Sequence, residues 1–268
     1  MNLMDELKKY KKMGYQVPPK RLIKTKEQIA AIRESGEVNT AVLDYIAENI
    51  KPGMSTDEID VMVYHKTVEL GGIPAPLGYE GFPRSVCTSL NNMVCHGIPD
   101  KNILLEEGDI VNVDVSTIYN GYFADSSRMF IIGETHPKVK KLVEVAKECI
   151  EKGLEQVIPW TPIGNVGAAV NEHAMANGFS VVSEVGGHGV GLEFHEDPYV
   201  SFVSERNTGM LMVPGMVFTI EPMVNMGGPD IYVDDSNGWT IYTEDDMPSA
   251  QWEVQVLVTE DGYEILAR

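Results

Sequence analysis

Residues 114–125, DVSTIYNGYFAD, predict the hairpin around which the rest of the chain can be organised. Asn-Gly is the strongest short-range signal for a two-residue hairpin turn, and the flanking residues are mostly β-branched or aromatic. With Asn120 and Gly121 as the turn, Tyr119 pairs with Tyr122 and the pairing runs back along both strands. The stretch therefore predicts an antiparallel hairpin that carries one aspartate on each strand.

The register of this hairpin brings the two aspartates together. Ser116 lies opposite Asp125, and Asp114 lies on the same face because side chains alternate between faces with period 2. Diagonal cross-strand neighbours are about 7 Å apart at the backbone, so the carboxylates can converge at their tips. Two unpaired anions at that separation repel each other, and we expect a positive group between them.

Composition limits the class of protein. The chain has 268 residues and is 43% hydrophobic, enough for one large domain or two small ones. No apolar run approaches the roughly 18 residues of a membrane span, and the charged start MNLMDELKKYKK lacks the apolar core typical of a secretion signal. The odd cysteine count, three, without framework spacing, predicts free thiols in a reducing cytoplasm.

The charge is unevenly distributed. A net charge of -19 argues against wrapping nucleic acid, yet residues 8–26 contain eight Lys or Arg and no acid. This basic run has two interpretations. It is either a solvated arm joined to the body through Pro18-Pro19, or an electrostatic contact for an anionic partner such as ribosomal RNA.

The order of predicted elements is duplicated. Hydrophobic periodicity and cap signals predict helices over residues 25–50, 52–72, 136–157 and 161–179. Strand patterns occupy residues 84–90, 92–98, 109–119, 121–132, 180–185, 216–224, 249–258 and 262–266. Each half therefore reads helix, helix, strands. This predicts an α+β fold of two halves that pack sheet to sheet, with helices outside and a crevice between them.

Cap signals set the ends of two of these helices. Ser55 or Thr56, with Glu58 following, predicts a capped start for the second helix, and Gly71-Gly72 predicts its end. Thr161 is the candidate cap of the fourth helix, and Gly178 is its candidate stop.

Four carboxylates lie at strand positions where an apolar residue would pack more easily: Asp114, Asp125, Glu221 and Glu253. Burying a carboxylate is costly unless it is paired, hydrogen-bonded or bound to a metal. Four such positions in one chain favour a metal site.

The six histidines separate into two groups. His65, His136 and His173 lie in or at the start of predicted helices, which favours structural or surface roles. The other three lie on glycine-flanked loops: His96, His188 and His195. Carboxylates with imidazoles suit Mn, Co, Fe or Zn, and four carboxylates balance two divalent ions. The absence of cysteine from the set disfavours a structural zinc site, and two metals that activate a shared water predict hydrolysis of an amide or phosphate ester.

Several stretches resemble one known family. They are GYEGFPRSVCTSLNNMVCHGIPD, GDIVNVDVSTIYNGYFADSSRMF, GGHGVGLEFHEDP, FTIEPMV and SAQWEVQVLVTEDGYEIL. In this order and spacing they resemble the type I methionine aminopeptidases of peptidase family M24, which have the pseudo-symmetric pita-bread fold. The matched stretches cover the chain from about residue 27 to its end, which implies a single catalytic domain over residues 27–268 after a basic arm over residues 1–26.

The resemblance implies a role for each candidate metal ligand. Asp125 and Glu253 would bridge two divalent ions, and Asp114 would complete one site. His188 and Glu221 would complete the other site, and Glu221 would act as general base toward the attacking bridging water.

The resemblance also implies how substrate binds. His195 would stabilise the scissile carbonyl as it becomes an oxyanion, and His96 would contact the substrate backbone nitrogen. The methionine pocket would contain Tyr79, Phe82, Cys87, Phe194 and Trp239. A Na or K site would involve Asn91, Ser249 and the backbone of Met93.

The implied activity is removal of the N-terminal Met from peptides and nascent chains, preferentially before a small second residue, by a cytoplasmic monomer. Two positions depart from the family pattern: bacterial members often have Cys where Pro76 stands, and His or Thr where Val254 stands. The alternatives are the proline-specific branch of the same fold, which usually carries an extra N-terminal domain, and a binding module that has lost its metals.

Overall fold

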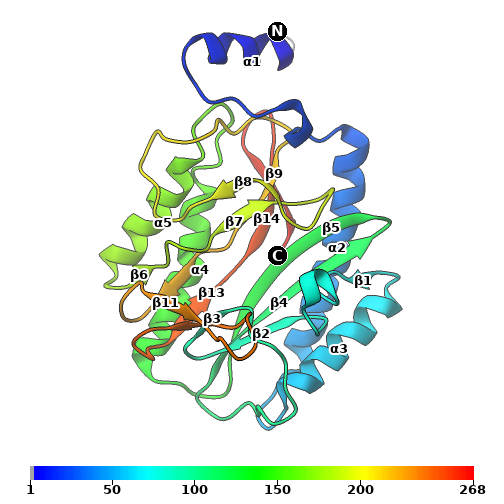
Figure 1. The fold of residues 1–268 in the computed structure, drawn as a ribbon, viewed down its shortest axis with the longest axis vertical. Helices are drawn as coiled ribbons and strands as arrows, with labels where there is room; N and C mark the ends of the chain where they lie inside the picture. The colour runs from blue at the N-terminus through cyan, green and yellow to red at the C-terminus, as the bar shows by residue number, and fades with distance from the viewer. Residues whose placement is uncertain (1–2) are drawn as a thin grey trace.

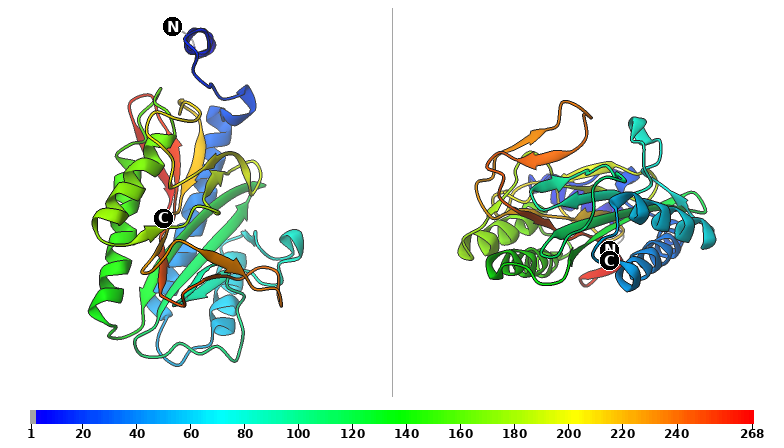
Figure 2. Two further views of the ribbon diagram at one scale, coloured as in Figure 1. Left: turned by 60° about the vertical axis from the view of Figure 1, so that its left-hand side comes forward. Right: turned by 90° about the horizontal axis from the view of Figure 1, so that it is seen from below.

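The computed structural model describes residues 3–268, with helices on one face of the molecule and antiparallel strands on the other (Figures 1 and 2). The α-helices of this part of the chain are α1 (Leu3–Lys12), α2 (Lys26–Asn49), α3 (Thr56–Glu69), α4 (Pro137–Leu154) and α5 (Gly164–Ala176). Two short 3-10 helices are η1 (Lys20–Leu22) and η2 (Tyr79–Gly81). The predicted α+β class is thus present.

The strands of the first half are β1 (Ile73–Pro74), β2 (Cys87–Leu90), β3 (Met93–Cys95), β4 (Ile110–Tyr119) and β5 (Tyr122–Ile131). Those of the second half are β6 (Ser180–Val181), β7 (Gly187–Gly189), β8 (Glu196–Val200), β9 (Val217–Ile220), β10 (Met223–Asn225), β11 (Ile231–Val233), β12 (Ile241–Thr243), β13 (Ser249–Gln251), β14 (Val254–Val258) and β15 (Tyr263–Ala267). One sheet has the order β1-β4-β2 with β5 on β4, and the largest sheet has the order β15-β14-β9-β7-β8.

The β4–β5 hairpin has the predicted register. Tyr119 pairs with Tyr122, and Ser116 pairs with Asp125. Asn120 and Gly121 have φ of 50° and 82°, the left-handed values that a tight hairpin turn of this kind requires. The turn therefore fixes which residues of both strands face the same side.

The two halves meet at their sheet edges. The backbones of Ser127, on β5, and Glu253, between β13 and β14, exchange two hydrogen bonds of 3.4 and 3.2 Å. The sheets are therefore joined side by side at this point, with α2 and α3 covering one half and α4 and α5 covering the other (Figure 2). Both halves contribute strands to the region that faces away from the helices.

Of the two helix caps predicted from the sequence, the cap of α3 is present and the cap of α5 is not. Ser55 caps α3 and forms a capping box with Glu58, as predicted. Thr161 does not cap α5: its hydroxyl donates to the Ile158 carbonyl, and the helix begins at Gly164. A local hydrogen bond to the preceding turn competes with the cap, as short hydroxyl side chains allow.

Two predicted strands are interrupted at their glutamate. The stretch 216–224 forms β9 and β10, which break at Glu221, and the stretch 249–258 forms β13 and β14, which break at Glu253. Strands β7 and β8, on either side of the loop that carries His195, are absent from the sequence prediction. Strand β7 is Gly-His-Gly, which shows no hydrophobic alternation, and β8 is a short strand that begins with two acids and contains Pro198, which disfavours a strand assignment.

The basic arm is attached to the body rather than simply solvated. Leu7 of α1 is buried, and Tyr10 stacks on Trp160 with ring centroids 5.0 Å apart. The Gln16 carbonyl accepts a hydrogen bond of 2.8 Å from Leu211 N–H. Helix α1 stands at one end of the molecule (Figure 1), and residues 1 and 2 of the predicted arm lie outside the described residues. None of the helices within residues 3–268 is long and apolar enough to cross a membrane.

The hairpin turn generates a stability prediction. Gly121→Ala should lower the free energy of unfolding by about 1 kcal/mol, because a residue with a Cβ is strained in the left-handed conformation. Denaturant unfolding of the metal-free protein measures this change. Gly262→Ala is the matched control: Gly262 lies in a strand connection, has open space around it and is not at positive φ. Equal losses in the two variants would contradict the turn assignment.

Candidate metal centre

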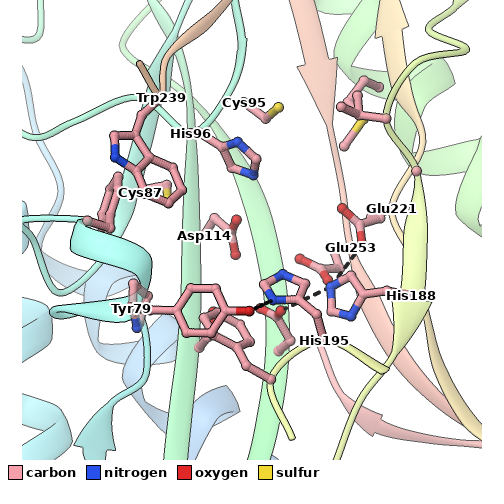
Figure 3. A pocket seen from close by; sticks show the side chains of 18 of the residues that line it. Tyr79, Cys87, Cys95, His96, Asp114, His188, His195, Glu221, Trp239 and Glu253 are labelled. Carbon is pink, nitrogen blue, oxygen red and sulfur yellow. Dashed lines mark hydrogen bonds and ion pairs between the residues drawn. The ribbon is translucent and has the colours of Figure 1, made fainter. Parts of the chain in front are cut away.

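The site is a cavity of about 440 Å³ between the two halves (Figure 3). Ligand-binding cavities typically fall in the range of about 300–1,000 Å³, so this one is large enough to hold a ligand. Every candidate metal, catalytic and pocket residue named from the sequence lines it: Tyr79, Phe82, Cys87, His96, Asp114, Asp125, His188, Phe194, His195, Glu221, Trp239 and Glu253. The candidate cation residues Asn91 and Ser249 are not among the lining residues.

Each carboxylate reaches the cavity from a different part of the fold. Asp114 and Asp125 come from β4 and β5 of the first half, and Glu221 and Glu253 come from the strand breaks of the second half. The Asp125 carboxylate accepts a hydrogen bond of 2.8 Å from the Ser116 hydroxyl opposite it. The edge-to-edge junction of the two sheets thus places four acids in one pocket.

His188 faces two of these carboxylates with an unprotonated nitrogen. Its Nδ1 lies 2.9 Å from the Gly189 carbonyl, which can only accept, so Nδ1 carries the proton. Its Nε2 lies 3.6 Å from Asp125 Oδ2 and 3.5 Å from Glu221 Oε1, beyond hydrogen-bond length. Burial lowers the pKa of His188 to about 3, so the ring is neutral. A lone pair aimed at carboxylate oxygens is the arrangement of a metal-ligating imidazole.

Burial also changes the protonation of the acids. Desolvation raises the pKa of Asp114 to about 7 and that of Glu221 to about 8. Burial, followed by repulsion from the neighbouring acids, raises the pKa values of Asp125 and Glu253 well above their usual range. Without a cation, these acids therefore retain protons near neutral pH. A divalent cation would displace those protons and compensate the charge.

The donor set fits a metal ion. Single ligand atoms of Asp125, His188 and Glu253 lie within 4.8 Å of one another. The buried atoms Asp114 Oδ1 and Glu253 Oε1 have no hydrogen-bond partner. Buried polar atoms are rarely left unpaired, so these two unpaired carboxylate oxygens favour a bound cation as their partner.

His195 and His96 lie beside the cluster. The rings of His195 and His188 have centroids 4.3 Å apart, and His195 Nδ1 lies 3.0 Å from the Tyr79 hydroxyl. Burial lowers the pKa of His195, and burial followed by the nearby His195 lowers the pKa of His96 to about 4. Both rings are therefore neutral at pH 7 and can each offer one donor and one acceptor.

Aromatic rings form the apolar part of the cavity. Phe82 packs edge-on against Trp239 with centroids 5.2 Å apart, and Tyr79 packs edge-on against Phe194 at 4.8 Å. The Cys87 thiol lies on β2 opposite Asp114. Apolar walls beside a charged cluster suit a ligand with a polar end and a flexible apolar side chain.

Sequence reasoning missed the residues that hold the carboxylates. Thr219 donates to Glu221 Oε1 at 2.6 Å, and Gln251 donates to Glu221 Oε2 at 3.1 Å. Thr219 and Gln251 stand two residues before Glu221 and Glu253, just as Ser116, already recognised opposite Asp125, stands two after Asp114. A period-2 search for polar residues on the acid-bearing faces would have found both. Further lining residues that were missed are Glu80, Cys95, Glu184, Val185, Gly186, Tyr199 and Met223.

The candidate cation residues lie close together but are already hydrogen-bonded. Ser249 N–H donates to the Asn91 carbonyl at 2.8 Å, and the Asn91 side-chain oxygen accepts from Ile110 N–H at 3.1 Å. The Na or K site stays a prediction.

The two departures from the family pattern both adjoin the cavity. Pro76 lines it, and Val254 is buried directly after Glu253. The next residue, Gln255, accepts a hydrogen bond of 3.0 Å on its side-chain oxygen from the backbone N–H of Asp125.

Fold and cavity together define a hydrolase of the pita-bread class with a carboxylate–histidine centre suited to metal. The model of metallopeptidase family M24 matches residues 30–260, and the chain belongs to that family. Methionine aminopeptidase A of Synechocystis sp. is 45% identical to it over 90% of this chain and 95% of the relative. The crystal structure of methionine aminopeptidase from Rickettsia prowazekii has a TM-score of 0.90 at 39% identity, with 92% of this chain and 99% of that chain covered.

These comparisons confirm the family and the fold that the sequence motifs indicated. Prolidase from Pyrococcus furiosus has a TM-score of 0.73 at 24% identity, which shows the shared fold alone. The match covers 92% of this chain but only 66% of the prolidase, in keeping with the larger chains expected of the proline-specific branch.

The cluster generates a prediction about metal content. Asp125→Asn should strongly reduce bound Mn or Co, because the amide removes one negative charge and one oxygen donor from the centre. Metal analysis after dialysis against a defined metal concentration measures the loss. Asp44→Asn, at an exposed ion pair with Arg128, is the control and should bind as the parent does. Unchanged metal content in Asp125→Asn would remove Asp125 from the centre.

Proposed function

We propose that this chain is a metal-dependent methionine aminopeptidase that removes the N-terminal Met from peptides and nascent chains, preferentially before a small second residue. One observation carries the proposal: the carboxylate–histidine cluster and an aromatic pocket with a thiol open into the same cavity. The membership of family M24 and the methionine aminopeptidase relatives support it.

We assign the metal ligands as five side chains. Asp125 and Glu253 would be shared by two divalent ions of the Mn, Fe, Co or Zn group; Asp114 would hold one, and His188 and Glu221 the other. Bound ions of this kind acidify water and polarise a carbonyl. The same site would hold the substrate's free α-amine, which makes the enzyme an exopeptidase.

The remaining chemistry belongs to the protein's own side chains. Glu221 would accept a proton from the attacking water, and its carboxylate is oriented for this by Thr219 and Gln251. Neutral His195 would donate a hydrogen bond to the scissile carbonyl oxygen, where negative charge develops. His96, buried and neutral, would contact the substrate backbone nitrogen and assist departure of the amine.

The pocket residues would select the side chain of the first substrate residue. Phe82 and Trp239 form one wall, and Tyr79 and Phe194 form another. Cys87 lines the same cavity and pairs across strands with Asp114. We expect an unbranched thioether to fill the space.

We also propose that the enzyme is a cytoplasmic monomer. Its three cysteines are free and buried, and we expect them to remain reduced there.

The substrate class is tested with peptides. Metal-loaded enzyme should release Met from Met-Ala-Ser and should leave X-Pro peptides intact; chelation should abolish turnover, and Mn or Co should restore it. Liquid chromatography of the products measures both. Purified protein that binds no metal and cleaves neither peptide would contradict the proposal, and cleavage of X-Pro alone would favour the proline-specific branch.

We further propose that the basic arm, residues 8–26, contacts an anionic surface of the ribosome. The four lysines of α1 are exposed: Lys8, Lys9, Lys11 and Lys12. Binding through such charges weakens steeply with salt because counterions are released. Helix α1 stands at the end of the molecule, away from strands β4 and β5 that carry Asp114 and Asp125 (Figure 1), so we expect it to bind a partner without covering the active site.

The arm generates its own prediction. Replacing the four α1 lysines by Gln should weaken ribosome binding at low salt and leave Met-Ala-Ser turnover at the parent value. Cosedimentation with ribosomes at two salt concentrations measures the first, and peptide turnover the second. A control with Lys138 and Lys140 of α4 replaced by Gln removes surface charge elsewhere. Equal loss in the control, or no loss in the α1 variant, would contradict a role for the arm.

A further inference from the structure

A buried ion pair connects the N-terminal segment to the loop that carries His195. The ammonium of Lys24 contacts Glu196 Oε2, and the two side chains are 1% and 11% exposed. Lys24 is fixed at its backbone as well, since its N–H donates to the Gly215 carbonyl at 2.8 Å. The residue after it, Thr25, is the N-cap of α2. Lys24 is therefore an anchored charge rather than a mobile surface lysine.

The other oxygen of Glu196 holds the loop. Glu196 Oε1 accepts hydrogen bonds from the backbone N–H of Leu192 at 2.7 Å and of Glu193 at 3.2 Å. These bonds close the turn between β7 and β8, whose last two residues before Glu196 are Phe194 and His195. Both of those residues line the cavity. The Glu196 carboxylate thus sets the shape of the segment that presents them.

We propose that Lys24 is a positioning residue for the active-site loop 192–196, acting through Glu196 on His195. The proposal rests on the proposed function only in that His195 acts on the substrate carbonyl. Lys24 is not among the residues that line the cavity. It holds the carboxylate of Glu196, whose other oxygen accepts hydrogen bonds from the loop backbone. The N-terminal segment is then part of the active-site scaffold from Lys24 onward, although the predicted catalytic domain began at residue 27.

Charge burial gives the physical reason. Removal of Lys24 leaves the Glu196 carboxylate buried without its counter-ion, which is strongly unfavourable. Glu196 can relieve this by turning toward solvent, and the N–H groups of Leu192 and Glu193 then lose their acceptor. Tyr79 still holds His195 Nδ1 from the other side, so the ring is displaced rather than released. Displacement of a group that acts in the transition state lowers kcat more than it raises KM.

The test compares variants in which residue 196 keeps or loses the side-chain oxygen that accepts from the Leu192 and Glu193 N–H groups. Lys24→Met should lower kcat on Met-Ala-Ser by about tenfold per metal-loaded enzyme, with KM within about twofold. Adding Glu196→Gln should recover most of kcat, because a neutral amide oxygen still accepts from Leu192 without needing a counter-ion. Adding Glu196→Leu instead should not, since leucine offers no acceptor. If Lys24→Met does not fold, the Gln and Leu double variants are compared directly.

A second measurement does not depend on activity. Hydrogen exchange of the 190–196 segment in metal-free protein should be about tenfold faster in Lys24→Met and close to the parent in the Gln double variant. Arg21→Ala is the control in both experiments, because the Arg21–Asp197 pair joins the same two segments through side chains that are 67% and 60% exposed. Exposed pairs contribute little, so this variant should match the parent.

The outcomes separate the two claims. Parent-like kcat and exchange in Lys24→Met, or equal kcat in the Gln and Leu double variants, overturns the positioning role. A parent enzyme that cleaves no Met peptide defeats the proposed function instead, and the exchange measurement still decides whether Lys24 orders the loop.

Discussion

Mutual repulsion among buried carboxylates is the constraint on which the structure depends. Asp114, Asp125, Glu221 and Glu253 share one cavity, and burial raises the pKa of every one of them. Such a cluster is unfavourable in a protein without a cation, since burial and mutual repulsion disfavour the charged carboxylates, which retain protons instead. The rest of the fold brings these acids together and prevents them from escaping to solvent.

Strand geometry explains how the fold does this. The Asn120-Gly121 turn fixes the β4–β5 register, and the period of 2 directs both aspartates to one face. The second half contributes its glutamates at the breaks between β9 and β10 and between β13 and β14, and both line the cavity. The bridge between Ser127 and Glu253 joins the halves directly at the cluster. The hydrogen bonds from Ser116, Thr219 and Gln251 then orient the carboxylates.

Much of this could be predicted from local patterns. A hairpin register follows from its turn residues, and the Ser55 capping box marks the start of α3, because both signals lie within a few residues of the feature they determine. The acids could be recognised because a carboxylate in an apolar strand is anomalous. Other features have no such signal. Strand β7, Gly-His-Gly, shows no hydrophobic alternation, and the attachment of the arm through Lys24 depends on Glu196, 172 residues away. Thr161 does not cap α5 because its hydroxyl bonds instead to the nearby Ile158 carbonyl, a local alternative that the cap signal does not reveal.

The central claim is that the cavity's acids are the ligands of divalent ions. Anomalous diffraction from crystals grown with Mn tests it most directly, because the signal locates the metal independently of activity. The account predicts anomalous peaks within coordination distance (about 2.0–2.3 Å) of Asp125 and Glu253 oxygen atoms, one of them also at that distance from His188 Nε2 and the other from an Asp114 oxygen. A cavity without anomalous density, at Mn concentrations that saturate the protein in solution, would contradict it.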